Sequence, residues 1–173
     1  MALPGTFDAL SAAQPRTLGV VVHLRRYRPE DWPRLCQIHD AARRDELASS
    51  GLDSAFLTLE QTAEAEGLFD GIVLVAVDEW EVRGFVAFTE DELTWIYVDP
   101  TQYRKGIGRA LLRQAVEAAG ATVKAEVLVR NQAALALYLS EGFEIVKRVD
   151  GKLTGNEAFA ASGYLLRRTK GDT

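Results

Sequence analysis

The segment from Val98 to Leu112, with the sequence VDPTQYRKGIGRALL, constrains the fold of this chain more than any other. An apolar run over residues 93–98 stops at Asp99-Pro100, and Gly106-Ile107-Gly108 precedes residues with helical periodicity. This order predicts a strand, a turn and a helix whose start is rich in glycine. Glycines leave the backbone N–H groups of a first helical turn uncovered, and the helix dipole adds partial positive charge there. The segment therefore predicts an anion-binding site.

The side chains around these glycines are basic. The stretch between residues 104 and 113 contains no acid, and it carries Arg104, Lys105, Arg109 and Arg113. These cations favour a phosphate, and more particularly a polyphosphate, as the anion. Two common phosphate motifs are excluded, because the chain has no P-loop string and Leu111 occupies the position where a dinucleotide fingerprint needs its third small residue.

Hydrophobic periodicity along the chain predicts an α/β domain with a mixed sheet. The expected strands cover residues 20–27, 72–77, 82–88, 93–98, 122–129, 143–149 and 161–168. The expected helices begin at Asp31, Thr58, Gly106 and Asn131. Asp31 is expected to cap the first helix, and Thr58-x-x-Gln61 is a capping box for a short second helix that ends at Gly67. Residues 150–160 are expected to separate the last two strands.

A chain of 173 residues fits one domain, expected over residues 19–173, after a loose N-terminal arm over residues 1–18. No apolar run approaches the ~20 residues of a membrane span, and we expect no signal peptide and no membrane partner. The single cysteine, Cys36, is expected to be a buried, inert thiol, which suits a cytoplasmic protein. The net charge of −5 argues against a nucleic-acid partner.

The segment at 98–112 resembles the acetyl-CoA-binding motif of the GCN5-related N-acetyltransferases, the GNAT family. That motif reads Gln/Arg-x-x-Gly-x-Gly/Ala and follows a strand that ends in Val-x-Pro. A second block, EVLVRNQAALALYLSEGF at 126–143, resembles the family's next strand and helix, in which an Asn opens the helix and a Tyr precedes Gly-Phe. Residues 24–32 resemble the first strand and helix, so the similarity covers about 21–168. The chain departs from the motif at Tyr103, where the family has Gln or Arg.

The resemblance implies the order β-α-α-β-β-β-α-β-α-β-β, a single GNAT-like domain in which the fourth and fifth strands splay apart to admit the pantetheine arm of acetyl-CoA. It also implies the residues that bind this cosubstrate. The backbone of Ile96, Tyr97 and Val98 pairs with pantetheine, and Asn131 points toward it. The diphosphate is held by the backbone amides of Arg104, Lys105, Gly106, Ile107, Gly108 and Arg109.

The same resemblance assigns a proton donor for the leaving thiolate to Tyr138, whose phenol is protonated at neutral pH. Glu126 and Glu92 are the candidate general bases, acting directly or through water. His39 lies on a helical stripe with Leu35 and Ala42 and is expected to be a core or interface histidine. It has no companions at metal-ligand spacing, and we expect no metal.

The family's acceptor site implies that residues 42–56 and 151–159 bind the amine here. Asp45, Glu46, Asn156 and Glu157 are candidates to bind an ammonium group, and Phe56 and Phe159 to line the site. Acidic residues between Asp78 and Glu92 either favour a cationic acceptor or are solvated turn residues.

Two functions remain open at this stage. The first is an N-acetyltransferase that moves an acetyl group from acetyl-CoA to a primary amine, either a small molecule or a peptide N-terminus, by direct attack in a ternary complex. The second is an acyl-CoA-binding sensor or regulatory module without turnover. Many relatives dimerise, so a homodimer is a further expectation from the resemblance.

Overall fold

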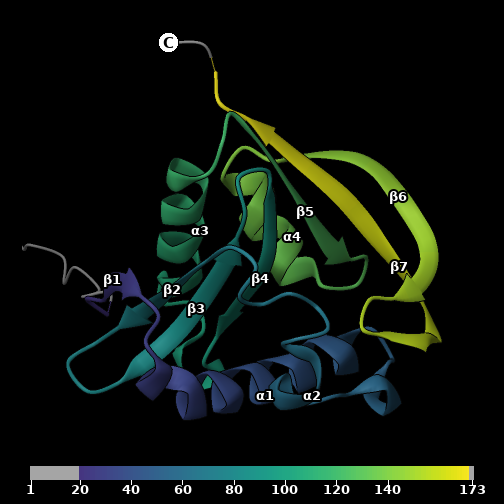
Figure 1. The fold of residues 1–173 in the computed structure, drawn as a ribbon. Coiled ribbons are helices and arrows are strands. Elements are labelled where there is room, and N and C mark those ends of the chain that lie inside the picture. Colours follow the sequence, from purple (N-terminus) through teal and green to yellow (C-terminus); the bar gives the residue numbers. More distant parts are fainter. Residues whose placement is uncertain (1–19, 172–173) are drawn as a thin grey trace, which may run out of the picture.

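The structure is a computed structural model, and it describes residues 20–171. The predicted arm over residues 1–18 lies outside the described residues. The elements follow the predicted order (Figure 1): β1 His23–Arg26, α1 Trp32–Ser49, α2 Leu59–Thr62, β2 Ile72–Val77, β3 Val82–Phe88, β4 Glu92–Val98, α3 Ile107–Ala118, β5 Thr122–Leu128, α4 Gln132–Ser140, β6 Glu144–Leu153 and β7 Asn156–Thr169. Among the described residues, no helix combines the length and the apolar character that crossing a membrane requires.

The strands form one mixed sheet with the order β1-β2-β3-β4-β5-β7-β6. Every neighbouring pair is antiparallel except β4 and β5, which are parallel and paired only at Glu92↔Lys124 and Leu93↔Ala125. Beyond this pairing the two strands diverge, as the resemblance implies. The predicted fold class is therefore confirmed.

A β-bulge in β4 decides which side chains face which side of the sheet. Trp95 pairs with Ala87 and Leu93 pairs with Phe88, which leaves Thr94 as the extra residue. Without the bulge, Leu93 and Trp95 would point to the same face. With it, Leu93 joins the core under α3 and α4, whereas Trp95 joins the core under α1.

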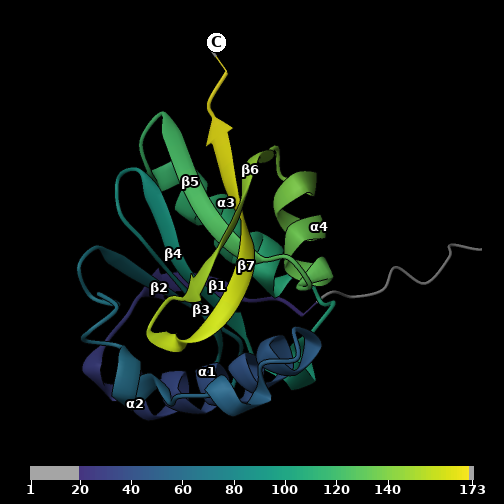
Figure 2. The ribbon, with the colours of Figure 1, turned by 90° about the vertical axis from the view of Figure 1, so that its right-hand side faces the viewer.

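Two cores lie on opposite faces of the sheet (Figure 2). The first contains Ile107, Leu111 and Leu166 between the sheet and α3 and α4. The second contains Leu35, Ile38 and other residues of α1 and the segment around α2, packed against β2, β3 and β4. A close approach supports the first core: a Cβ added at Gly84 on β3 would lie 3.1 Å from Leu111 and 3.3 Å from Ile107 on α3.

The last two strands are longer than expected. Periodicity predicts a separation over residues 150–160, but β6 and β7 continue through this region and meet in a tight turn at Thr154–Gly155. The resulting hairpin curls toward α1 and α2 (Figures 1 and 2). Asn156 at its tip donates a hydrogen bond to the carbonyl of Ala55 at 2.9 Å. Hydrogen bonds between the two strands therefore replace the expected loop.

Two predicted helix ends also differ. The Asp31 side chain makes no capping bond to α1, because its carboxylate binds the Arg25 guanidinium at 2.7 Å and the Arg28 amide at 2.9 Å. The capping box of Thr58 and Gln61 is confirmed, with Gln61 N–H 3.3 Å from Thr58 Oγ1. However, α2 ends at Thr62, and turns continue to Gly67.

Candidate active site

The start of α3 presents a row of free backbone amides. Among the residues that the structure describes, the N–H groups from Arg104 to Arg109 donate to no protein acceptor, and Ala110 is the first residue to bond back, to Gly106 at 3.0 Å. Gly106 has φ of +85°, and a Cβ placed on it would meet nothing within 4 Å. This backbone fits a diphosphate, because several donors at a helix N-terminus remain uncovered. The glycine prediction therefore agrees with the geometry of this amide cradle (residues 104–109).

The four predicted cations are not all free to bind a phosphate. Arg109 and Arg113 bind the Glu141 carboxylate at 2.5 and 2.8 Å. The hydrogen bond from Arg113 is the main cause of the lowered pKa of Glu141. Lys105 Nζ donates to the Gln102 side chain at 3.0 Å. Arg104 has φ of +61°, the one left-handed non-glycine residue in the described chain. The cradle is therefore basic. Its backbone amides make no hydrogen bonds to described residues, whereas the side chains of Lys105, Arg109 and Arg113 already bind protein groups.

A buried carboxylate holds the turn between β4 and the cradle. Asp99 is 7% exposed, and its Oδ1 accepts from the Thr101 amide at 2.9 Å and from the Thr101 hydroxyl at 2.8 Å. Its Oδ2 binds the Arg34 guanidinium of α1. These hydrogen bonds, opposed by burial, lower the pKa of Asp99. The turn that leads into the cradle is thus tied to α1.

The backbone of β4 is open on the side that faces β5. The N–H of Asp99 donates to the carbonyl of Arg83 on β3 at 2.8 Å. Because backbone groups alternate in direction along a strand, the N–H of Tyr97 also faces β3, whereas those of Ile96 and Val98 face away. These two residues lie beyond the short pairing with β5. The backbone N–H and C=O groups of Ile96 and Val98 are therefore unpaired at this edge, whereas those of Tyr97 face β3.

Asn131 and Tyr138 lie on the other side of the gap, at the two ends of α4. Asn131 caps the helix, since its Oδ1 accepts from the Ala134 amide at 3.2 Å. Tyr138 is 3% exposed and packs edge to face on Phe143, with ring centroids 5.1 Å apart. Burial raises the pKa of Tyr138, and Glu46 adds to that rise. The phenol therefore stays protonated at neutral pH and can donate.

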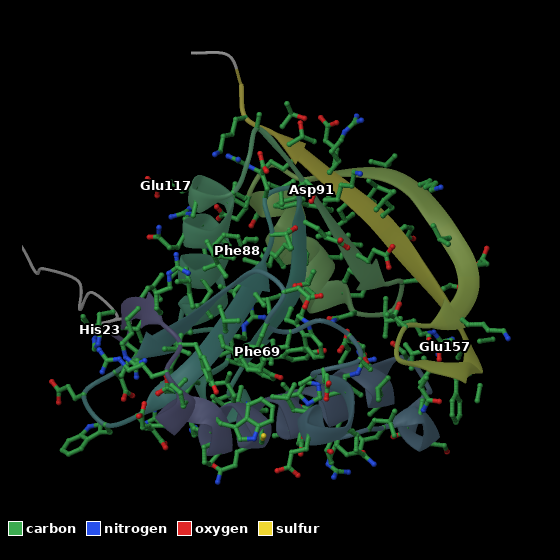
Figure 3. The ribbon with its side chains drawn as sticks, in the orientation of Figure 1. His23, Phe69, Phe88, Asp91, Glu117 and Glu157 are labelled. Carbon is green, nitrogen blue, oxygen red and sulfur yellow. The ribbon has the colours of Figure 1, made fainter. Side chains whose placement is uncertain are left out.

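A cavity of about 650 Å³ lies on the α1 side of β4 and β5. Its lining includes five glutamates, contributed by α1, the turns after α2, β4, β5 and β7: Glu46, Glu66, Glu92, Glu126 and Glu157. Arg43 and Lys152 are the cations in the same wall. Figure 3 shows Glu157 on the β6–β7 hairpin, above α1. The wall is acidic where the gap between β4 and β5 opens.

Mutual repulsion marks two glutamate pairs in this cavity. Desolvation raises the pKa of Glu92, and the charges of Glu126 and Asp91 raise it further. At the other end desolvation raises the pKa of Glu66, with Glu157 adding to the rise and Arg43 opposing it. A cation bound between the members of either pair would relieve this repulsion.

Glu46 connects α1 to both sides of the gap. Its Oε2 accepts from Arg43 at 2.7 Å and from the Tyr97 hydroxyl at 3.2 Å, and Asn131 Nδ2 lies 3.5 Å from its Oε1. Burial and the Glu46 charge raise the pKa of Tyr97. Glu46 was predicted to bind the acceptor, but its oxygens are already engaged by protein donors.

Other predicted acceptor residues divide between the cavity and its surroundings. Asn156 lines the cavity with Glu157, whereas Phe56 and Phe159 pack in a separate small core with Leu47 and Leu153. Neither aromatic residue is part of the cavity wall, although Ala55 and Leu153 of the same small core are. Asp45 is exposed and does not line it.

The acids of the β2–β3 turn form ion pairs instead of a substrate surface. Asp78 binds Arg83 at 2.5 Å and accepts from the turn amides of Trp80 and Glu81. Its pKa falls to about 2, because these hydrogen bonds outweigh desolvation. Glu81 binds Arg83 at 2.6 Å. Of the acids between Asp78 and Glu92, only Glu92 is part of the described cavity wall.

Tyr103, the departure from the family motif, is 43% exposed on the turn before the cradle. Its pKa rises to about 12 through partial burial and the charges of Asp45 and Glu46. The side chain therefore extends from the cradle toward the second half of α1. Cys36 is a free thiol whose pKa burial raises to about 11, so it is protonated at neutral pH and unreactive.

His39 is a site residue that the periodicity analysis assigned to the core. It is buried as expected, at 2% exposure, but it also lines the cavity. The signal was present in the sequence: His39, Arg43 and Glu46 follow i, i+4, i+7 spacing and form a polar stripe on the inner face of α1.

The site therefore combines an amide cradle at a helix start with a parallel strand pair that opens beside an acidic cavity. Residues 69–145 match the model of the acetyltransferase (GNAT) domain. The chain is 43% identical over 84 residues to the N-alpha-acetyltransferase RimI of Mycobacterium tuberculosis, a match covering 48% of this chain and 51% of that protein. The chain thus spans about half the length of this curated relative.

Two solved structures share the fold. A GCN5-related N-acetyltransferase from Rhodopseudomonas palustris superposes with a TM-score of 0.74 at 17% identity, covering 90% of this chain and 99% of that one. The yncA protein of Salmonella typhimurium, solved with its cofactor acetyl-CoA, has a TM-score of 0.66 at 20% identity, covering 88% and 95%. The chain is therefore similar to GNAT acetyltransferases in sequence over residues 69–145 and in fold over most of its length.

Proposed function

We propose that this protein is an N-acetyltransferase that moves an acetyl group from acetyl-CoA to a primary amine. The observation that carries the proposal is the continuity of the free amides from Arg104 to Arg109 with the free edge of β4, next to an acidic cavity on the α1 side. Acetyl-CoA supplies a thioester carbonyl, which an amine attacks directly in a ternary complex.

The donor half of the site is built from backbone groups. The cradle amides bind the diphosphate, and the outward N–H and C=O groups of Ile96 and Val98 pair with the amide-bearing pantetheine arm. A free N–H on this edge also polarises the thioester carbonyl, in the manner of an oxyanion hole. Asn131 binds the arm from the opposite side with the part of its amide that the helix cap and Glu46 leave available.

Tyr138 protonates the departing thiolate. Its hydroxyl makes no hydrogen bond to a described residue. Within residues 20–171, Ser50 Oγ is the one side-chain polar atom that is both fully enclosed and without a hydrogen bond, so the Tyr138 hydroxyl must retain some accessible surface. A buried phenol with a raised pKa is protonated at neutral pH, so it can donate a hydrogen bond to sulfur as negative charge develops there and pass its proton to the thiolate. Glu126 and Glu92 attract the ammonium form of the acceptor and are candidates to receive its proton.

The acceptor is a cationic amine. Five glutamates against two cations give the cavity wall a negative charge, which concentrates ammonium groups and repels acidic substrates. The relative RimI carries the name N-alpha-acetyltransferase, which favours a peptide N-terminus over a free small molecule. Asn156 and Glu157, in the cavity wall at the hairpin, contact the residues that follow such a terminus in this proposal.

The test is a panel of amines and short peptides offered with acetyl-CoA, with release of the free CoA thiol as the readout. We expect amine-dependent release, faster for peptides and cationic amines than for acidic ones. Binding of acetyl-CoA is followed separately as a rise in melting temperature. If acetyl-CoA stabilises the protein but no acceptor ever releases thiol, the alternative of an acyl-CoA-binding sensor replaces the enzyme.

A further inference from the structure

His39 is held by two aromatic rings of β4 and by a carboxylate of its own helix, α1. Its ring lies 4.9 Å from the Tyr97 ring in an edge-on arrangement and 5.7 Å from the Trp95 ring, centroid to centroid. Its Nδ1 lies 2.9 Å from Asp40 Oδ1. The same Asp40 oxygen accepts the Leu59 N–H at the start of α2, also at 2.9 Å. The imidazole therefore has one fixed orientation.

The Asp40 carboxylate also fixes the tautomer. A carboxylate at Nδ1 requires a proton on that nitrogen, so in the neutral ring Nε2 carries a lone pair and no hydrogen. Nε2 makes no hydrogen bond to a described residue. Within residues 20–171, Ser50 Oγ is the one side-chain polar atom that is both fully enclosed and without a hydrogen bond, so Nε2 must retain some accessible surface. Because His39 lines the cavity, the free lone pair of Nε2 is accessible from it.

The charges around the ring come from every element that faces it. Asp40, Arg43 and Glu46 lie on α1, Tyr97 lies on β4, and the remaining cavity acids are Glu66 after α2, Glu92 on β4, Glu126 on β5 and Glu157 on β7. Burial lowers the pKa of His39, the Asp40 hydrogen bond opposes that, and Arg43 adds to the lowering. The ring is therefore neutral at physiological pH.

We propose that His39 Nε2 is the general base that takes the proton of the acceptor's ammonium group, with Asp40 as its positioning residue. This inference rests on the proposed acetyltransferase function. The ammonium proton passes to Nε2, and the freed nitrogen lone pair forms the new C–N bond as the C–S electron pair leaves with sulfur. Tyr138 gives its proton to the thiolate, and the second proton of the nitrogen then passes, directly or through water, to the Tyr138 phenolate. One proton in total leaves His39 for solvent.

Geometry favours His39 over the carboxylates for this role. Glu126 and Glu92 are exposed and repel each other, so an ammonium group gains by staying charged between them. A neutral imidazole in the same wall is a base that does not stabilise the ammonium form. The glutamates therefore attract the cation, and His39 removes its proton.

The test is the pH profile of kcat/KM for a fixed amine acceptor. With an intact base, kcat/KM rises through one ionisation below pH 6.5, stays level, and falls above the pKa of the acceptor amine. In His39→Gln only the free amine reacts, so kcat/KM rises tenfold per pH unit up to the amine's pKa. At pH 7 we expect a loss of about 10²–10³-fold. A structural role would instead lower the whole profile in parallel without changing its shape.

Asp40→Asn covers the case in which His39→Gln does not fold. The Asn oxygen still accepts from Nδ1–H and from the Leu59 amide, but it lowers the basicity of the ring. We expect the acid limb to move to lower pH and the plateau to fall about tenfold. As a readout independent of turnover, ¹⁵N NMR of His23→Gln, which leaves His39 as the one histidine of the chain, should show an Nδ1–H tautomer at pH 7.

Two results would overturn the assignment. One is a His39→Gln profile parallel to that of the wild type. The other is a tenfold rise per pH unit in Glu126→Gln with a level profile in His39→Gln, which would make Glu126 the base. Failure of the proposed function is distinct from both, because then the unmodified protein releases no thiol while the NMR signal of His39 is unchanged.

Discussion

The hydroxyl of Tyr97 donates a hydrogen bond to Glu46 Oε2 at 3.2 Å, across 51 residues of sequence. This contact joins α1 to β4 where β4 and β5 diverge. The same carboxylate binds Arg43 at 2.7 Å and lies 3.5 Å from Asn131 at the start of α4. One glutamate thus joins the three elements that surround the gap, and the position of α1 is coupled to the shape of the gap between β4 and β5.

Removing either partner of this contact should destabilise the protein unequally. Tyr97→Phe loses one hydrogen bond, which costs about 0.5–1.5 kcal/mol. Glu46→Ala also leaves Arg43 without its carboxylate, so we expect a loss of about 2–3 kcal/mol. Urea unfolding measures both. Glu79→Ala, at an exposed residue of the β2–β3 turn that forms no ion pair with a described residue, is the control and should leave the urea midpoint unchanged. Equal effects of the first two variants would contradict the central role of Glu46.

Gly106→Ala should separate ligand binding from stability. The φ of +85° disfavours any residue with a Cβ by about 1 kcal/mol. The added methyl also projects into the open space in front of the cradle, which the diphosphate fills in the proposed complex, so acetyl-CoA should bind about tenfold more weakly, a loss of ~1.4 kcal/mol. Gly142→Ala has the same backbone strain at φ of +86° but lies outside the cradle. It should lower the melting temperature similarly and leave the affinity, measured by calorimetry, unaltered.

Tyr138→Phe tests the proton donor. We expect kcat to fall about 10²–10⁴-fold, because the thiolate must leave without a proton, while the KM for acetyl-CoA stays within about twofold. The phenol has no partner among the described residues, so the melting temperature should change little. Tyr27→Phe, in the opposite core beside Phe69, is the control and should retain full activity. Retention of kcat in Tyr138→Phe would remove this residue from the mechanism.

Glu92→Gln should stabilise the protein at neutral pH. Desolvation and the charge of Glu126 raise the folded-state pKa of Glu92 above its ordinary value of 4.5. A raised pKa means that the folded state binds this proton more tightly, so its contribution to stability is present below pH 4.5 and is lost as pH rises through the folded pKa. The variant should therefore melt at a higher temperature than wild type at pH 7, with no gain below pH 4.5. Glu79→Gln on the exposed β2–β3 turn controls for net charge, and an equal gain there would refute the argument.

Local patterns predicted the backbone geometry at the start of α3. The run of apolar residues before Asp99 and the glycines after it are contiguous in sequence, and a helix N-terminus needs only neighbouring residues to form. The cap at Asn131 and the burial of Tyr138 follow from a nine-residue helix, Gln132–Ser140, with helical spacing. These features depend on i to i+4 relations, which sequence displays directly.

The hairpin of β6 and β7 was predicted less well, because residues 150–160 carry no apolar alternation and owe their strand conformation to cross-strand pairing. The residues assigned to the acceptor site were harder to predict for the same reason, because contacts between distant segments decide where they lie. Phe56 and Phe159 are 103 positions apart, and the sequence does not indicate that they pack in one small core.

By itself the sequence determined the order of elements, the free amides of the cradle and the place of Tyr138, because periodicity and glycine chemistry act over a few residues. The tertiary structure alone decided that Glu46 meets Tyr97, that Glu92 faces Glu126, and that a buried histidine on α1 opens onto the cavity. Each of these contacts depends on how far β4 and β5 diverge. Each also depends on the bulge at Thr94, which sets the face of the sheet that the side chains of β4 point to. Such relations arise when distant segments pack, and the free energy that selects them is shared over the whole core.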